Sequence, residues 1–276
     1  MRKIRFKKWG FEIFGVLLAL LYLSPFYIIL TNSLKSKRNV LVDTLGWPEE
    51  IMMENYFMAW DRMNFMQTFF NSLIITIVSV LVITVFSSMA AWVLVRTKNK
   101  TSSVIFYTFV GAMLIPFQAV MLPLVSMMGP NNLNLINTRY GIIFLYLGFG
   151  ASLSIFLYHG FIKNIPTSLE EAAIIDGCST WQVFYHIIFP LLKPITVTVA
   201  ILNSIWIWND FLLPSLVLQE KSVRTIPLQM QFFFGAFSKD WHLAMAALAL
   251  SIIPIIIFYI FAQKHIIAGV TAGSGK

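Results

Sequence analysis

Long apolar stretches without Lys, Arg, Asp or Glu alternate with short polar segments along the chain. They cover residues 13–34, 68–95, 101–138, 140–162, 194–209 and 241–263. A helix that spans a bilayer needs about 20 mostly apolar residues. Residues 129–134 are polar, so in the third stretch we expect one helix to about Met128 followed by a loop. We expect the fifth to continue past Asp210 to Gln219. The pattern predicts six transmembrane helices.

The composition supports an all-α integral membrane protein. The chain has 276 residues, of which 58% are hydrophobic and only 12% are charged. Soluble domains carry about 25% charged residues, twice this share. The composition therefore excludes a soluble globular enzyme and a disordered chain.

Few residues are available for metal or disulfide chemistry. Cys178 is the only cysteine, which excludes an internal disulfide and a cysteine-built metal cluster, and the four histidines have no metal-ligand spacing. The net charge is +8, but Lys and Arg gather at the ends of the apolar stretches. Anionic lipid and membrane topology explain that placement better than nucleic acid, so we expect neither a metal site nor a nucleic-acid partner.

The positive-inside rule predicts that both termini are cytoplasmic. With the N-terminus inside, twelve of the 20 Lys and Arg residues lie in inner segments: Arg2, Lys3, Arg5, Lys7, Lys8, Arg96, Lys98, Lys100, Lys163, Lys193, Lys264 and Lys276. A signal peptide is the competing interpretation of residues 1–31, but the apolar stretch is too long and no small-residue cleavage site follows it.

The expected organisation follows from these assignments. The chain comprises a cytoplasmic N-terminus (1–12), a first transmembrane helix (13–34), an external loop (35–67), a core of five helices (68–265) that includes an inner loop (163–193), and a cytoplasmic tail (266–276). No internal repeat is found, which counts mildly against a secondary transporter.

The inner loop 163–193 has the pattern helix–break–helix. Ser168 with Glu171 forms a capping box, and Thr167 with Glu170 is an equally good alternative. Gly177 suits the end of this first short helix.

A second short helix should follow in the same loop. Ser179 or Thr180 can cap it, and it should stop near Pro190. In the first helix, Ala172 and Ala173 predict a flat patch beside the charged Glu171. A flat patch with a charge at the membrane surface indicates a docking surface for a partner.

Several motifs resemble those of one family. Glu171-Ala172-Ala173, Asp176-Gly177, Phe184, Ile187 and Pro190 are similar to the EAA signature of binding-protein-dependent ABC importer permeases, in the carbohydrate-uptake subfamily and on the side of the shorter maltose-type subunit. Other stretches that resemble this subfamily are Asn71–Leu73, Ile115–Gln118 with Pro123–Leu124, Leu135–Thr138, Trp208–Asp210, Thr225–Pro227 and Gln263–Gly273. The likeness covers the chain from about Ile13 to its C-terminus. Cys178 departs from it, because the family commonly has Ala there.

The resemblance implies a type I ABC importer permease (MetI-like) fold in a bacterial or archaeal cytoplasmic membrane. It implies a second homologous permease subunit, two ABC ATPase subunits on the inner loop, and an extracytoplasmic solute-binding protein. ATP and Mg would be bound by the ATPase, so this chain would be neither an enzyme nor a cofactor carrier.

The family also assigns roles within the inner loop. Glu171, beside Glu170, would make the polar contact to the ATPase, and Ala172 with Ala173 would provide the close-approach surface. Gly177 would form the bend, and the signature extends through Asp176 to Pro190.

The C-terminus, Gly269 to Lys276, superficially resembles a phosphate-binding loop. Five residues separate Gly269 from Gly275 where the motif requires four before its Gly-Lys, and the chain stops at Lys276. We therefore expect no nucleotide binding by this chain. The tail either reaches the ATPase or frays.

The fifth helix contains the candidates for contact with the transported solute. Asn203, Trp206 and Asp210 share one helical face, with Asn209 beside them. Aromatic rings beside hydrogen-bonding groups suit a sugar, whereas the alternative is that Asn209 and Asp210 only hold helices together near the outer rim. Asn71, Gln118 and residues 229–239 are weaker candidates, and 229–239 could touch the binding protein.

We predict a permease subunit of an ATP-driven carbohydrate importer, for an oligosaccharide. Alternatives are an importer of a glycerol-phosphodiester or polyuronate, a secondary transporter or channel, and a membrane scaffold. The predicted spans contain no concentration of cationic residues, which favours a neutral sugar. Apart from His242 at the start of the last stretch, they supply only Asp210 and His159 as ionisable groups for ion coupling.

Overall fold

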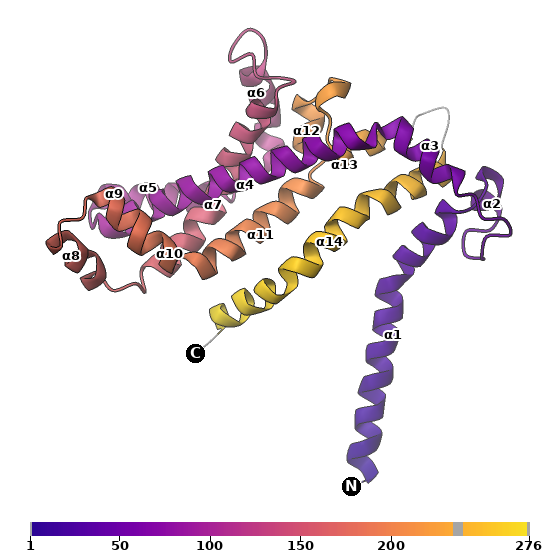
Figure 1. Cartoon of the computed structure of the whole chain (residues 1–276), viewed down its shortest axis with the longest axis horizontal. Coiled ribbons are helices and arrows are strands. Elements are labelled where there is room, and N and C mark those ends of the chain that lie inside the picture. Colours follow the sequence, from indigo (N-terminus) through magenta and orange to yellow (C-terminus); the bar gives the residue numbers. More distant parts are fainter. Residues whose placement is uncertain (1, 234–239, 275–276) are drawn as a thin grey trace. The chain divides into compact units, whose positions relative to one another are not determined.

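The computed structural model describes residues 2–233 and 240–274 (Figure 1). Every regular element in these ranges is helical. The longer helices are α1 (Arg2–Ser33), α4 (Phe65–Arg96), α5 (Lys100–Ala112), α6 (Phe117–Met128), α7 (Arg139–Ile162), α11 (Lys193–Asn209) and α14 (Trp241–Ser274). The shorter ones are α2 (Lys37–Val42), α3 (Glu54–Met63), α8 (Ser168–Ile175), α9 (Thr180–Val183), η1 (Phe184–Ile188), α10 (Phe189–Leu191), α12 (Leu212–Val217), η2 (Lys221–Val223), α13 (Ile226–Met230) and η3 (Gln231–Phe233).

The described helices confirm an all-α membrane fold. Four are long and apolar enough to cross a bilayer: Phe11–Ser33, Phe65–Arg96, Arg139–Ile162 and Trp241–Phe261. Two bent pairs pass the same test, Lys100–Ala112 with Phe117–Met128 (bent by 102°) and Thr180–Leu191 with Lys193–Asn209 (bent by 75°). If each pair is one span, the described chain has six.

The third apolar stretch differs from the expected single helix to Met128. It breaks after Ala112, and α6 begins at Phe117 behind an extended Pro116. Proline lacks an N–H and disfavours helical dihedrals in the residue before it. The expectation of one unbroken helix is therefore wrong, and the break lies at Pro116.

The fifth helix also ends earlier than expected. It stops at Asn209, and Asp210 is extended with ψ of 128°. The Asp210 carboxylate accepts a hydrogen bond from the backbone N–H of Leu212 at 3.0 Å. The carboxylate thus bonds the backbone at the start of α12, so the helix does not continue to Gln219.

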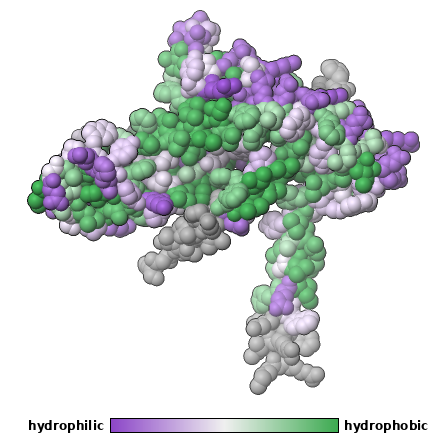
Figure 2. Space-filling model, in the orientation of Figure 1, coloured by the Kyte–Doolittle hydropathy of each residue, from purple (hydrophilic) through white to green (hydrophobic). Residues whose placement is uncertain are grey.

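The chain divides into two compact units. The first unit covers residues 1–65 and 230–257, and the second covers 66–229 and 258–276. In the first unit, none of the most apolar window of α1 is buried, and Figure 2 shows mostly hydrophobic residues on its described part. Such a surface needs lipid or a partner helix to cover it.

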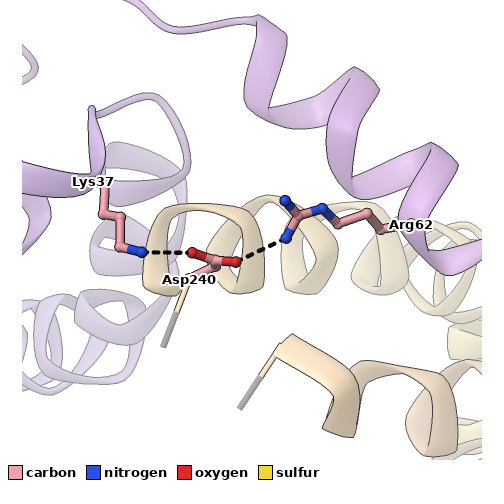
Figure 3. A network of polar contacts seen from close by, with 3 residues as sticks. All are labelled: Lys37, Arg62 and Asp240. Atoms are coloured by element: carbon pink, nitrogen blue, oxygen red, sulfur yellow. Dashed lines mark hydrogen bonds and ion pairs between the residues drawn. The ribbon is translucent and has the colours of Figure 1, made fainter. Parts of the chain in front are cut away.

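An ionic network links three elements of the first unit (Figure 3). Asp240, just before α14, accepts from Lys37 Nζ of α2 at 2.9 Å and from Arg62 Nη1 of α3 at 2.8 Å. These hydrogen bonds hold the pKa of Asp240 below its ordinary value. The ionised form of Asp240 is therefore favoured over the protonated form in the folded protein.

Replacing Asp240 with Asn is expected to lower stability by roughly 0.5–1 kcal/mol near neutral pH, since both cations are largely exposed and screened. Because the pKa of Asp240 is lower in the folded protein, its carboxylate stabilises the fold at pH values above the unfolded-state pKa of about 3.9. This stabilisation is lost as the pH falls through the folded-state pKa. Thermal unfolding of both proteins between pH 3 and 7 measures this. If the difference in stability between the original protein and Asp240→Asn does not decrease toward pH 3, the ion pairs do not stabilise the fold.

The second unit has two hydrophobic clusters. One includes Ile75, Ile83 and Tyr146, and the other includes Ala91, Tyr158 and Phe184. The second cluster joins the ends of α4 and α7 to the inner loop. Part of that loop is therefore built into the protein core.

Asn71, one of the weaker solute candidates, makes hydrogen bonds to a segment far along the chain. Its amide donates to the carbonyls of Ser222 (2.9 Å) and Arg224 (3.0 Å), and its oxygen accepts from Arg139 Nε. The neighbouring Ser72 hydroxyl accepts from the N–H of Ile226 at 2.9 Å. The Asn-Ser pair therefore secures residues 222–226.

Candidate functional site

The inner loop forms the helix–break–helix structure predicted from its sequence. α8 is followed by a turn at Gly177, then by α9, η1 and α10, and a bend of 75° leads into α11. At the start of α9, the Ser179 hydroxyl accepts from the Gln182 N–H, and the Gln182 side chain accepts from the Ser179 N–H. Ser179 is therefore the cap of the second helix, which reaches Leu191 next to Pro190.

Neither capping box expected at the first helix forms. Thr167 precedes α8 with helical dihedrals and makes no side-chain cap bond. The Glu170 carboxylate is engaged elsewhere, with Arg96 and Trp92. A tertiary contact has thus replaced the predicted local one.

Gly177 ends α8 as expected. Its φ is +86°, in the region that favours glycine. Its N–H donates to the Ile174 carbonyl, and the Cys178 N–H donates to the Ala173 carbonyl, both at 3.0 Å. This bond pattern closes the helix end and turns the chain toward α9.

Glu170 anchors α8 to the end of α4. Its side chain is 10% exposed and its Oε1 accepts from Arg96 Nη2 at 2.6 Å and Nε at 2.7 Å. Its Oε2 accepts from Trp92 Nε1 at 3.1 Å. Arg96 Nη2 also donates to the Ile165 carbonyl at 3.0 Å. Glu170 therefore faces the protein interior.

The two alanines of the loop face different environments. Ala173 is buried in the second hydrophobic cluster, whereas Ala172 is exposed. The predicted flat patch formed by both alanines is therefore wrong, because the helix turns one of them into the core. Glu171, Asp176, Gly177 and Pro190 are exposed with Ala172.

Large apolar side chains accompany these exposed residues. Ile175 is 85% exposed and Trp181 is 64% exposed, and Leu169, Ile174 and Tyr185 are also exposed. We call the residues Leu169, Glu171, Ala172, Ile174, Ile175, Asp176, Trp181 and Tyr185 the outer face of the loop. An apolar surface with two carboxylates on a short, core-anchored helix is suited to receive a partner protein.

The predicted solute-path residues lie in two places. Asn203 is buried and donates to Ser154 Oγ of α7 (3.1 Å) and to the Val199 carbonyl (2.8 Å). Asn209 is exposed and donates to the Ile205 carbonyl. Asn203 thus binds α11 to α7, and its amide nitrogen is used in doing so.

Tyr146 of α7 brings Trp206 and Asp210 together. Its hydroxyl donates to Asp210 Oδ2 at 3.0 Å, and its ring packs edge-on against Trp206 with centroids 5.4 Å apart. Trp206 remains 41% exposed. Trp206 therefore presents an exposed aromatic surface beside a carboxylate that Tyr146 holds in place.

Three supporting residues were missed at the sequence level. Arg96 and Trp92 hold Glu170, and Tyr146 holds Asp210. Arg96 was assigned only to the count of inner positive charges. Its pairing depends on contacts between residues 74 positions apart, and no local pattern marks such a contact.

Some predicted sites fall outside what the structure describes. Residues 234–239 of the stretch 229–239 and residues 275–276 of the C-terminal tail are outside the described ranges, as are the side chains of 264–276. Gln118 is described and exposed at the start of α6.

Comparison with known proteins gives consistent matches. Residues 83–272 match the family model of binding-protein-dependent transport system inner membrane components. A probable starch degradation products transport system permease protein of Thermoanaerobacterium thermosulfurigenes is 48% identical over 276 residues, covering 100% of each chain. A melibiose/raffinose/stachyose import permease protein of Bacillus subtilis is 36% identical, covering 95% of this chain and 94% of that protein.

A solved structure has a similar fold. It is a bacterial ABC transporter involved in the import of the acidic polysaccharide alginate, and one of its chains matches with a TM-score of 0.79. The match covers 96% of this chain and 98% of that one at 24% sequence identity. At this identity the likeness concerns the fold.

Proposed function

Because this chain belongs to the binding-protein-dependent transport system inner membrane components, the permeases of ABC importers, we propose that it helps to form the path of an oligosaccharide importer. It is a multi-pass membrane protein and a transport subunit, not an enzyme in itself. The names of its relatives, which concern starch degradation products and the melibiose series, support an oligosaccharide. Family membership sets aside a self-sufficient secondary transporter and a scaffold without transport.

The solute of this chain is proposed to be neutral. An anionic solute such as a polyuronate or a glycerol-phosphodiester would require cations along the path. The described aromatic–carboxylate group of Tyr146, Trp206 and Asp210 carries an acid instead. A carboxylate repels an anion and accepts hydrogen bonds from sugar hydroxyls.

The inner loop is proposed to couple this path to separate ATPase subunits that bind ATP and Mg. The observation that supports this role is the outer face of the loop, which is apolar, acidic and exposed while Glu170 fixes the same helix to α4. A rigid anchored helix can transmit movement from an ATPase to the membrane helices as a coupling free energy. We propose that both chain ends and this loop lie in the cytoplasm, which the distribution of positive charge supports.

The single substitution Ile175→Asp is expected to lower recovery of ATPase subunits about tenfold, since it places a charge in the centre of an apolar contact. The measurement is quantitative mass spectrometry of proteins that co-purify with the tagged chain in mild detergent. Val42→Asp in α2 is the matched control, because Val42 is similarly exposed (77%) outside the loop. Equal ATPase recovery from both variants would rule out docking at the outer face.

The exposed part of the Trp206 ring is proposed as a solute contact, with Asn209 and Asp210 beside it. Asn203 is proposed to support this site by holding α11 to α7. The alternative, that these residues only pack helices together, predicts an effect on stability without an effect on solute concentration dependence.

Trp206→Ala is expected to raise the KM for uptake about two- to tenfold, because aromatic contacts contribute roughly 0.5–1.5 kcal/mol each. Uptake by vesicles over a range of sugar concentrations measures it. Trp47→Ala in the first unit is the control, since Trp47 is exposed and lies outside the proposed path. An unchanged KM with lower thermal stability would establish a packing role.

A further inference from the structure

A polar pocket lies where three helices of the second unit reach one surface of the membrane. It is formed by the end of α4, the connection to α5, the first turns of α5 and the end of α7, and has a volume of about 480 Å³. α4 and α7 are both candidate spans, ending at Arg96 and Ile162. The pocket is therefore at the level of lipid headgroups, beside the inner loop.

Three cationic side chains line this pocket. They are Lys98 before α5, Lys100 at its first residue and Lys163 just after α7. The lining contains no Asp or Glu. Within the described part of the chain these lysines form no ion pair. They create a local positive charge that the protein itself leaves uncompensated.

Polar and apolar groups complement that charge. Asn99, Ser102 and Ser103 contribute hydrogen-bonding groups at the N-terminal end of α5, where the helix dipole also favours an anion. The Asn99 side chain accepts from the Ser102 N–H at 2.7 Å, which fixes this turn.

The pocket wall is apolar toward the membrane. Phe106 stacks on His159 with ring centroids 3.7 Å apart, and Leu94 and Val95 line the wall beside them. Tyr107 is 69% exposed on the surface of α5. The pocket thus has a cationic, polar part next to an apolar wall. A ligand with an anionic head and a hydrocarbon part fits these two surfaces better than a fully hydrated ion does.

We propose that this pocket binds the headgroup of an anionic phospholipid. The lysines neutralise its phosphate, the α5 turn donates hydrogen bonds, and the glycerol and upper acyl chains lie along Leu94, Phe106 and Tyr107. The proposal requires that α4 and α7 span the membrane. It is independent of the identity of the transported sugar and of ATPase docking.

The test uses the purified full chain with its co-purifying subunits in vesicles of phosphatidylcholine with phosphatidylglycerol. A photoreactive phosphatidylglycerol is cross-linked, and labelled peptides covering residues 94–107 are quantified. Lys98→Gln with Lys163→Gln should reduce labelling about thirtyfold, because each of the two lysines near an anionic surface contributes about 1 kcal/mol. Arg38→Gln with Lys221→Gln removes the same charge at exposed positions outside the pocket and should preserve the labelling.

Additional experiments distinguish an anionic lipid from other ligands of the pocket. A photoreactive phosphatidylcholine should label these residues weakly in every variant. Displacement of the anionic probe by millimolar inorganic phosphate would overturn the lipid in favour of a free-phosphate site. Equal labelling of the two double variants would also overturn the proposal. Labelling is read without transport, so a failure of sugar uptake leaves this result unaffected.

Discussion

Glu170→Ala is expected to detach the inner loop from α4 and to lower ATP-dependent uptake about tenfold or more. Removal of one partner from a mostly buried ion pair destabilises by about 3–5 kcal/mol, because the other charge loses its compensation. Here the Arg96 guanidinium and the Trp92 N–H both lose their acceptor. Uptake by vesicles and thermal unfolding of the purified chain measure the two effects.

Glu171→Ala is the matched control for the stability measurement. Glu171 is the exposed neighbour of Glu170, and exposed substitutions generally change stability by less than about 0.5 kcal/mol. The double variant Glu170→Ala with Arg96→Ala should destabilise by less than the sum of the single variants, since they remove the same contact. Additive effects, or unchanged unfolding of Glu170→Ala, would show that the pair does not anchor the loop.

Gly177→Pro is expected to reduce uptake by about tenfold or more. Proline fixes φ near −65° and has no N–H, whereas Gly177 has φ of +86° and donates to the Ile174 carbonyl. Proline at this position can supply neither the positive φ nor the N–H donor, so the chain cannot turn from α8 into α9 in its present geometry. The measurement is ATP-dependent uptake together with ATP hydrolysis by the purified transporter.

Gly177→Asn is the control for this position. Asparagine adopts left-handed dihedrals more readily than most residues and keeps the N–H, so most of the uptake should be retained. The contact of Gly177 with α8 is local, and a Cβ at this residue meets nothing within 4 Å. Full uptake by Gly177→Pro would refute a role of this turn in coupling.

Local chemistry in the sequence was sufficient to predict the turn of the inner loop. A glycine at a helix end, and Ser179 or Thr180 before the second short helix, specify backbone conformations over a few positions. Both features are present in the structure. The break at Pro116 follows from equally local chemistry, but hydrophobicity averaged over the long stretch concealed it.

The partners of charged residues could not be predicted in this way. Glu170 was assigned to an outward role beside Glu171 because a sequence motif does not show which side of a short helix faces the core. The fold brings Arg96 to Glu170, and it brings Tyr146 to both Trp206 and Asp210. Only the tertiary structure therefore shows which residues of the candidate site anchor it to the core and which are exposed.

The sequence by itself determined that this protein is an all-helical membrane protein, because long apolar stretches and short capped turns depend on composition and on neighbouring residues. The resemblance of its motifs to those of a known family indicated a permease. Only the tertiary structure decided which carboxylate of the inner loop is buried, and which surface remains for a partner. That decision depends on long-range contacts, such as the pairing of Glu170 with Arg96 and the packing of Ala173 into the core. Burial is set by the residues that surround a side chain in space, and these are far away in the chain.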